Sequence, residues 1–359
     1  MSTDALTIDA DKLQDPDNAS GKIETRRIDE SHLRPERDGV VSPEPEGDSA
    51  ADHFAAGIRQ PSAVRGSTSL SQLFRDLIEL TKPRIVVMIL ITTMATALIG
   101  AGQAVELIQL VWLLVGTGLV AASAGAANQV WERSIDQRMT RTASRPVAIG
   151  RFSVGPACLY TVVMGSLGCY LLYDHFHAIP AMVGAATWLL YVLVYTPMKT
   201  RTSWNTTVGA VAGAIPMLIG YTATGGSLLD VTGWLLVGIL VAWQYPHFMA
   251  IAWIYRKQYA EAGFQMSTTV DPTGRNAGLQ SILGSCLLIG CSLALCWIPP
   301  VSLGNLAASA AVVLVSWPML RTSFAFSGKP DDLVARQLLR KSLLVLPLVL
   351  AIVTIRLFW

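Results

Sequence analysis

The sequence predicts an all-α polytopic membrane protein with nine transmembrane helices. Two observations support this fold class. Hydrophobic residues make up 52% of the 359 residues, whereas charged residues make up 14%. Nine apolar segments are each close to the ~20 residues that a helix needs to cross a bilayer. The formal net charge of +2 gives no global positive field, which argues against a nucleic-acid-binding protein.

Residues 1–68 are predicted to form a disordered cytoplasmic tail. They are rich in Asp, Glu, Pro, Ser and Gly and contain no apolar run long enough to build a core. Apolar residues then recur at helical spacing, at Leu70, Leu73, Phe74, Leu77 and Ile78. This pattern predicts an amphipathic helix over 69–82 that lies on the membrane surface. With the bundle that follows, it makes up one membrane domain over 69–359.

The transmembrane bundle is expected over 85–358. Its apolar segments run approximately over 85–102, 106–127, 154–173, 178–196, 207–223, 229–254, 278–298, 303–320 and 341–358. Basic residues follow the second, fourth, sixth and eighth segments, among them Arg133, Arg138, Arg141, Arg145, Arg151, Lys199, Arg201, Arg256, Lys257, Arg275, Arg321, Lys329, Arg336 and Arg340. The odd-numbered connections contain no Lys or Arg. Since cytoplasmic loops are enriched in these residues, the N-terminus and the even-numbered connections are expected in the cytoplasm.

The second connection carries the most informative pattern, AANQVWERSIDQRMTRTASRPVAIGR over 126–151. Asn128, Glu132 and Asp136 recur every four residues, so they return to nearly the same face of a helix. Carboxylates at a membrane boundary are costly, and a row of them suggests a hard divalent cation such as magnesium. Arg141 and Arg145 follow, and guanidinium groups bind phosphate oxygens bidentately. This combination is what an enzyme needs to ionise a prenyl diphosphate.

The length of this row limits how it could bind metal. From Asn128 to Asp136 the helix rises by about 12 Å, which is too far for all three side chains to ligate one ion. Adjacent members are therefore expected to share an ion. The third would reach a second ion or an ordered water molecule.

A second polar cluster, YTPMKTRTSWN, covers 195–205. Lys199 and Arg201 could complete a cationic clamp on a diphosphate, or they could be basic anchors at the membrane surface. Tyr195 lies four residues before Lys199, so a continued helix would turn both toward the same cavity. Pro197 could interrupt that helix.

A third cluster covers 243–271 and contains His247 inside an apolar segment. This histidine could be hydrogen-bonded packing or a functional group, because ionisable residues inside a membrane are often functional. The surrounding aromatic residues could line a pocket for a flat or polyunsaturated substrate, or form an interfacial belt.

Together these clusters resemble the protohaem IX farnesyltransferases (haem O synthases) of the UbiA superfamily of intramembrane prenyltransferases. The resemblance extends from about Leu77 to the end of the chain. It is carried by TKPRI at 81–85, NQVWERSIDQRMTRTASRP at 128–146, YTPMKTRT at 195–202, AGAIPMLIGY at 212–221, PHF at 246–248, AGFQM at 262–266 and SLLVLPLVL at 342–350.

The resemblance implies a UbiA-like fold, in which nine transmembrane helices surround a central cavity, and transfer of a farnesyl group from farnesyl diphosphate to a vinyl group of haem B. The product would be haem O for terminal oxidases. The implied setting is the bilayer of a bacterial cytoplasmic (inner) membrane, with oxidase-assembly proteins or haem A synthase as further partners. The implied residues are Asn128, Glu132 and Asp136 for catalysis and magnesium, Arg141, Arg145, Lys199 and Arg201 for the diphosphate, and His247 and Tyr259 for the haem pocket.

One position departs from the family pattern. An acidic pair usually precedes the tyrosine of the sixth connection, whereas this chain has Lys257, Gln258 and Tyr259 there. Glutamine cannot supply the charge of a carboxylate, although Glu261 or Asp271 could compensate. Two alternatives therefore stay open. The chain could prenylate another acceptor, such as an aromatic acid or quinone precursor, or it could bind haem or prenyl lipid without catalysis. A transporter is disfavoured because the polar groups gather at one face of the membrane.

Overall fold

The computed structural model describes residues 69–299 and 302–358, and the regular elements in these ranges are all helical. The predicted all-α class is confirmed, whereas the predicted tail over 1–68 lies outside the described residues. The elements are α1 (Leu70–Leu80), α2 (Pro83–Ala101), α3 (Leu107–Asp136), α4 (Val154–His175), α5 (Ala178–Leu189), the π-helix η2 (Leu190–Tyr195), α6 (Thr196–Met198), α7 (Asn205–Ala214), α8 (Pro216–Ala223), α9 (Val231–Ile254), α10 (Arg256–Glu261), α11 (Ser267–Val270), α12 (Arg275–Cys296), α13 (Leu303–Gly328) and α14 (Asp332–Phe358).

Across the part of the chain that is described, nine helical spans are long and apolar enough to cross a membrane, as predicted. Several extend past the apolar runs that predicted them. The second span, α3, ends at Asp136 rather than at residue 127, and the ninth, α14, begins at Asp332 rather than at residue 341. An apolar run ends where side chains leave the lipid, but a helix ends where its backbone hydrogen bonds end. The acidic row therefore lies on the last turns of a transmembrane helix.

The fourth span stays helical through Pro197 by changing its winding. After α5 the backbone passes through the π-helix η2 and then through α6, where Pro197 lies in the first turn. Proline has no N–H to donate, so it is tolerated at the start of a helical segment. The Thr196 hydroxyl donates to the Tyr191 carbonyl (2.9 Å) in the π-helical turn. Single π-helical turns inside α-helices are frequent at functional sites.

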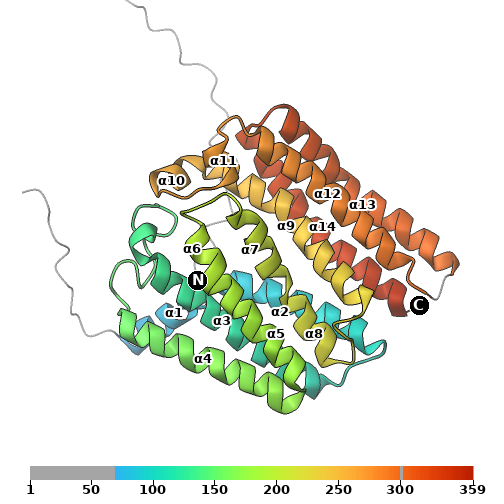
Figure 1. Cartoon of the computed structure of the whole chain (residues 1–359), viewed down its shortest axis with the longest axis horizontal. Helices are drawn as coiled ribbons and strands as arrows, with labels where there is room; N and C mark the ends of the chain where they lie inside the picture. Colours follow the sequence, from blue (N-terminus) through green and yellow to red (C-terminus); the bar gives the residue numbers. More distant parts are fainter. Residues whose placement is uncertain (1–68, 300–301, 359) are drawn as a thin grey trace, which may run out of the picture. The chain divides into compact units, whose positions relative to one another are not determined.

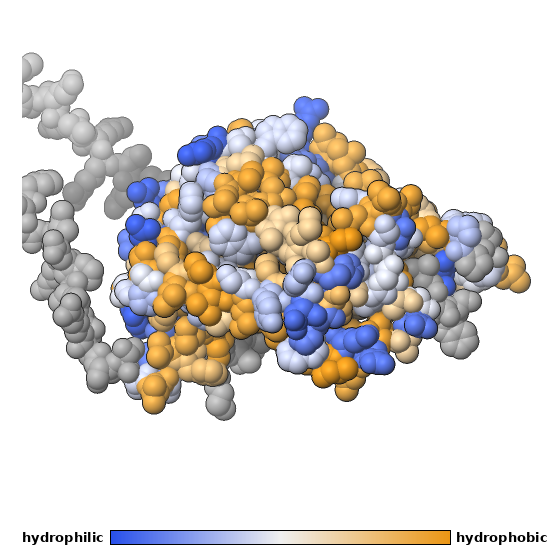
Figure 2. All heavy atoms as spheres, turned by 60° about the horizontal axis from the view of Figure 1, so that its bottom comes forward, coloured by the Kyte–Doolittle hydropathy of each residue, from blue (hydrophilic) through white to orange (hydrophobic). Residues whose placement is uncertain are grey.

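In Figure 1, α3, α4 and α5 form one side of the bundle and α12, α13 and α14 the other, with α7 and α9 between them. The two most buried spans are Asn205–Ala223 and Val231–Ile254. The outward faces are apolar, and residues such as Leu159 and Leu344 are more than 60% exposed. Figure 2 shows hydrophobic residues over much of one such face. Apolar patches of this extent are typical of a membrane-embedded surface.

Helix α1 turns its polar side toward the bundle. Asp76 is 1% exposed and accepts hydrogen bonds from Arg151 Nε (2.9 Å to each carboxylate oxygen). Gln129 of α3 donates to the carbonyls of Glu79 and Leu80 at the end of α1. The apolar side faces outward, with Leu70 85% and Phe74 65% exposed. The predicted amphipathic helix is present. Leu77 and Leu80 at its C-terminal end pack against the bundle, whereas Leu70 and Phe74 are left exposed.

Candidate active site

The acidic row on α3 forms the floor of the candidate site. Asn128 and Asp136 are fully buried and Glu132 is 4% exposed. The four-residue spacing thus turns all three side chains into the protein, as the sequence pattern predicts. Their burial would be costly without partners, because isolated polar and charged groups lose their hydration.

A cation meets each member of the row. The Lys82 ammonium donates to Asn128 Oδ1, and Lys199 Nζ donates to Glu132 Oε1 (2.6 Å). Arg145 Nη1 donates to both carboxylate oxygens of Asp136 (2.8 and 2.7 Å) and lies 4.0 Å from Glu132 Oε2. Three basic side chains therefore face two carboxylates and one neutral amide.

Lys199 is held by groups that come from distant parts of the sequence. Its ammonium lies 4.6 Å from the centroid of the Tyr195 ring, which confirms that these two residues share a face of the continued helix. Its carbonyl accepts from Gln265 N (2.7 Å), in the AGFQM segment. Although burial alone would lower it, the neighbouring Glu132 carboxylate raises the pKa of Lys199 above its ordinary value. Lys199 is therefore a fixed cation of the site.

Sequence reasoning assigned no role to Lys82. This residue precedes α2 and is the one non-glycine residue with left-handed backbone among those described (φ 54°). Such a conformation is uncommon for residues with a Cβ and often marks a functional position. Burial, together with Arg145 and Lys199, lowers the pKa of Lys82 to about 7. The sequence signal that could have identified Lys82 is the TKPRI motif, in which Pro83 restricts the backbone directly after this lysine.

The other two predicted diphosphate ligands lie apart from the row. The Arg141 guanidinium stacks over Tyr255 and Tyr259, at 4.8 and 5.8 Å from their ring centroids. This arrangement is a cation–π contact that connects the second and sixth connections. Arg201 is exposed, next to the Lys199 segment. Of the four predicted cations, the structure brings Arg145 and Lys199 directly onto the carboxylates.

The structure separates the two residues predicted for the haem pocket. His247 Nδ1 lies 3.0 Å from the Ser342 hydroxyl of α14, and its ring stacks on Trp243. Tyr259 is buried in a small apolar cluster with Met139 and Phe264, below Arg141. Among the described residues, the hydrogen bonds and ring contacts of His247 and those of Tyr259 involve different partners. They would therefore contact different parts of any one ligand.

The sixth connection does not supply a replacement carboxylate. Gln258 Oε1 is buried without a hydrogen-bond partner among the described residues. Asp271 accepts from the backbone N–H groups of Thr273 (3.1 Å) and Asn276 (2.9 Å), so its carboxylate caps the start of α12. The hydrogen bond from the Thr273 hydroxyl, and after it that from the Asn276 backbone, lower the pKa of Asp271. Glu261 is exposed.

The donor set of the row fits magnesium. Mg²⁺ prefers oxygen ligands and is usually held by one or two carboxylates together with substrate phosphates and water. The row offers two buried carboxylates and an amide oxygen. Within residues 69–299 and 302–358, no three His, Cys, Asp or Glu side chains gather as a metal site. Full coordination would therefore require oxygens from a bound diphosphate or from water.

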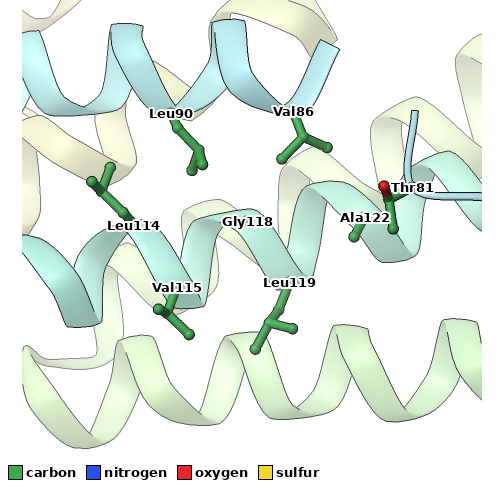
Figure 3. A pocket seen from close by; sticks show the side chains of 8 residues that line it. All are labelled: Thr81, Val86, Leu90, Leu114, Val115, Gly118, Leu119 and Ala122. Carbon is green, nitrogen blue, oxygen red and sulfur yellow. The ribbon is translucent and has the colours of Figure 1, made fainter. Parts of the chain in front are cut away.

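An apolar groove of about 370 Å³ lies between α2 and α3 (Figure 3). Its lining includes Val86 and Leu90 of α2 and Leu114 and Leu119 of α3. Thr81, the residue before Lys82, lines it next to Ala122. The groove thus reaches the polar end of the bundle near Lys82.

Comparison with known proteins places this arrangement in a family. The profile described as "UbiA prenyltransferase family" matches residues 89–345. A protoheme IX farnesyltransferase of Rhodopirellula baltica is 57% identical over 284 residues, covering 78% of this chain and 99% of the relative. A protein of the same name from Solibacter usitatus is 40% identical over 289 residues, covering 77% and 96%.

Solved structures share the fold at low sequence identity. A digeranylgeranylglyceryl phosphate synthase superposes with a TM-score of 0.66 at 13% identity, covering 79% of this chain and 98% of that one. A UbiA homologue from Archaeoglobus fulgidus, bound to DMAPP and Mg²⁺, superposes with a TM-score of 0.57 at 14% identity, covering 78% and 99%. The chain belongs to the UbiA prenyltransferase family and, within it, to the protoheme IX farnesyltransferases.

Proposed function

We propose that this protein transfers a farnesyl group from farnesyl diphosphate to a vinyl group of haem B in a magnesium-dependent reaction, giving haem O. The observation that carries the proposal is the buried row of Asn128, Glu132 and Asp136 facing three cations. The names of the bacterial relatives support farnesyl diphosphate and haem as the substrates.

Catalysis is expected to be mainly electrostatic. When the bond between farnesyl C1 and the diphosphate oxygen breaks, its electron pair leaves with the oxygen, and the allylic carbon becomes positive. Lys199, Arg145 and Lys82 would stabilise the departing anion, because fixed charges in a site that excludes water need little reorganisation. Arg141 and Arg201 would join them at the outer diphosphate oxygens. The terminal vinyl carbon of haem B then bonds to C1, and the positive charge passes to the other vinyl carbon. That carbon takes up a water molecule and a proton is released, which gives the hydroxyl group of haem O.

Adjacent members of the row of Asn128, Glu132 and Asp136 would share a magnesium ion. When bound, the metal would neutralise charge on the diphosphate and so make it a better leaving group. Each residue of the row is already paired with a basic side chain. A bound metal would take the place of these basic side chains beside the row, and the basic side chains would then contact the diphosphate. The apolar surroundings of the row would keep water from the allylic cation until the vinyl group reacts.

We also propose that the polar end of the bundle faces the cytoplasm of a bacterial inner membrane. The basic residues of the even-numbered connections support this orientation. Helix α1 would lie on the same surface, with Leu70 and Phe74 in the lipid and Asp76 bonded to Arg151. The quenching by brominated lipids that a Phe74→Trp variant adds to that of the ten native tryptophans tests this placement. No added quenching at any bromine position would contradict it.

The test of the function is the haem content of membranes from a haem-O-deficient bacterium that expresses this chain, resolved by chromatography and mass. Haem O is expected with the unmutated chain and not with an Asp136→Asn variant. If the protein is present in the membrane and no haem O forms, the haem acceptor is wrong. Incubating the same membranes with radiolabelled farnesyl diphosphate and quinone precursors would then identify another acceptor.

A further inference from the structure

The hydrogen bonds around His247 determine which of its ring nitrogens carries the proton. Nδ1 lies 3.0 Å from Ser342 Oγ, and Ser342 Oγ donates to the Leu339 carbonyl (2.7 Å). A hydroxyl has one hydrogen to donate. Because that hydrogen is used toward Leu339, the serine accepts from His247, and the proton of the neutral imidazole lies on Nδ1. The Nε2 atom is left with its lone pair.

The imidazole ring is also fixed in orientation. It stacks on Trp243, one helical turn earlier on α9, with centroids 4.6 Å apart and planes 23° apart. Trp243 Nε1 donates to the Ser342 carbonyl (2.6 Å), so the same serine holds both rings. Rotation of the imidazole would break the hydrogen bond to Ser342 and the stacking on Trp243. The direction of the Nε2 lone pair is therefore set by α9 and α14 together.

Nothing in the described protein uses this lone pair. His247 Nε2 has no hydrogen-bond partner within residues 69–299 and 302–358. Packing accounts for Nδ1 and for the stacked ring face, whereas Nε2 belongs to a partly buried ring and stays available to a ligand. Neutral imidazole is the commonest protein ligand of metals. Histidines that bind metals almost always donate the other ring N–H to a fixed acceptor, as His247 does to Ser342.

We propose that His247 binds the iron of the haem acceptor through Nε2, and that Ser342 is the positioning residue that fixes its tautomer. This inference rests on the proposed function and specifies where its acceptor binds. The haem would then lie against α9 and α14, whereas the diphosphate would lie at the row on α3. Tyr259, with its contacts to Arg141, belongs to the diphosphate side.

The test is a titration of the purified full-length protein with ferric haem b, without farnesyl diphosphate. A histidine-ligated Soret band and the matching electron paramagnetic resonance signal are expected. A His247→Gln variant should lack both. Ser342→Ala should weaken haem binding roughly tenfold, the usual cost of losing the partner of a metal-bound histidine. Ser285→Ala is the matched control, since this buried serine bonds Ser281 of its own helix α12 and Ser323 of α13, away from His247.

Binding of metal-free protoporphyrin IX distinguishes a His247 that binds the iron from a His247 that only lines the porphyrin pocket. This binding, followed by fluorescence, should be the same in the unmutated protein and in His247→Gln. An equal loss of haem and metal-free porphyrin would overturn the proposal, as would an unchanged Soret band in His247→Gln. Haem O formation is measured separately on the same proteins. Histidine ligation without haem O would support the haem site and contradict the proposed reaction. Haem O without histidine ligation would support the reaction and contradict the haem site.

Discussion

The row on α3 and the sixth connection, residues 255–274, meet at the same end of the bundle but carry different chemistry. The row buries two carboxylates and an amide, each paired with a cation. The sixth connection presents the aromatic faces of Tyr255 and Tyr259 to Arg141, and its central polar residue is the neutral Gln258. Its acidic residues are engaged elsewhere or exposed, since Asp271 caps α12 and Glu261 faces outward.

This difference concentrates the negative charge of the described site on one helix. A metal bound there would be held from the α3 side, while the sixth connection would contribute aromatic surface and hydrogen bonding. Gln258 has a buried Oε1 without a hydrogen-bond partner among the described residues. A carboxylate at this position would give the sixth connection the same kind of charge as the row. The predictions below therefore remove the charge of the row, disturb its supports, or add charge to the other region.

The largest effect is expected from Asp136→Asn. The variant keeps the shape of the side chain but removes the charge that Arg145 contacts, so turnover should fall at least roughly 1000-fold by analogy with the loss of key electrostatic groups. The turnover is measured as haem O formed per unit of membrane protein. Asp230→Asn is the matched control, because that carboxylate bonds Tyr221 and Ser227 at the start of α9. Near-normal turnover in Asp136→Asn would remove this carboxylate from the mechanism.

Lys199→Met should combine a functional and a structural loss. It leaves Glu132 buried without its closest cation, which typically costs about 3–5 kcal/mol of stability, and turnover should fall roughly 100-fold or more. Thermal unfolding in detergent measures the first effect. The double variant Lys199→Met, Glu132→Gln should recover most of the stability but none of the activity. Recovery of activity as well would show that the pair is only structural.

A smaller effect is expected from Gly209→Ala on α7. An added Cβ would lie 2.5 Å from Tyr195 Cε2, so the ring beneath Lys199 must move. A displaced cation should lower turnover by roughly ten- to a hundredfold, with little change in expression. Gly155→Ala is the control, because no atom lies within 4 Å of its Cβ position. Equal turnover in the two variants would mean that the position of the Tyr195 ring is unimportant.

The smallest effect is expected from Gln258→Asp, which makes the sixth connection resemble the row. If position 258 faces the diphosphate and its metal, activity should be kept or raised a few-fold, and less magnesium should be needed for half-maximal turnover. A magnesium titration of the membrane assay measures both. A collapse of turnover would show that the site is built around the neutral amide.

Sequence periodicity was sufficient for the local features of the site. The four-residue spacing predicted that Asn128, Glu132 and Asp136 share one face of a helix, and the structure confirms this. It also offered a shared side for Tyr195 and Lys199 if the helix continued past Pro197, which it does. The role of Arg145 in the cation set was also indicated by its place after the row. These predictions succeeded because each depends on the geometry of a single helix.

The features that sequence reasoning missed join segments far apart in the chain. Lys82 reaches Asn128 across 46 positions, and Gln265 holds the Lys199 segment from the sixth connection. The grouping of His247 with Tyr259 in one haem pocket came from the resemblance to the family and stays a prediction. In the structure they contact different elements, because α9 ends between them and the chain turns into α10.

The sequence by itself determined the all-α class, the nine spans and the shared helical face of the acidic row, since apolar length and helical period act within one segment. The tertiary structure decided which cation meets each row residue, that the carboxylates gather on α3 alone, and that Ser342 of α14 sets the tautomer of His247. Charge pairing and hydrogen bonding act over a few ångströms of space, and only packing of the helices brings distant residues within that distance.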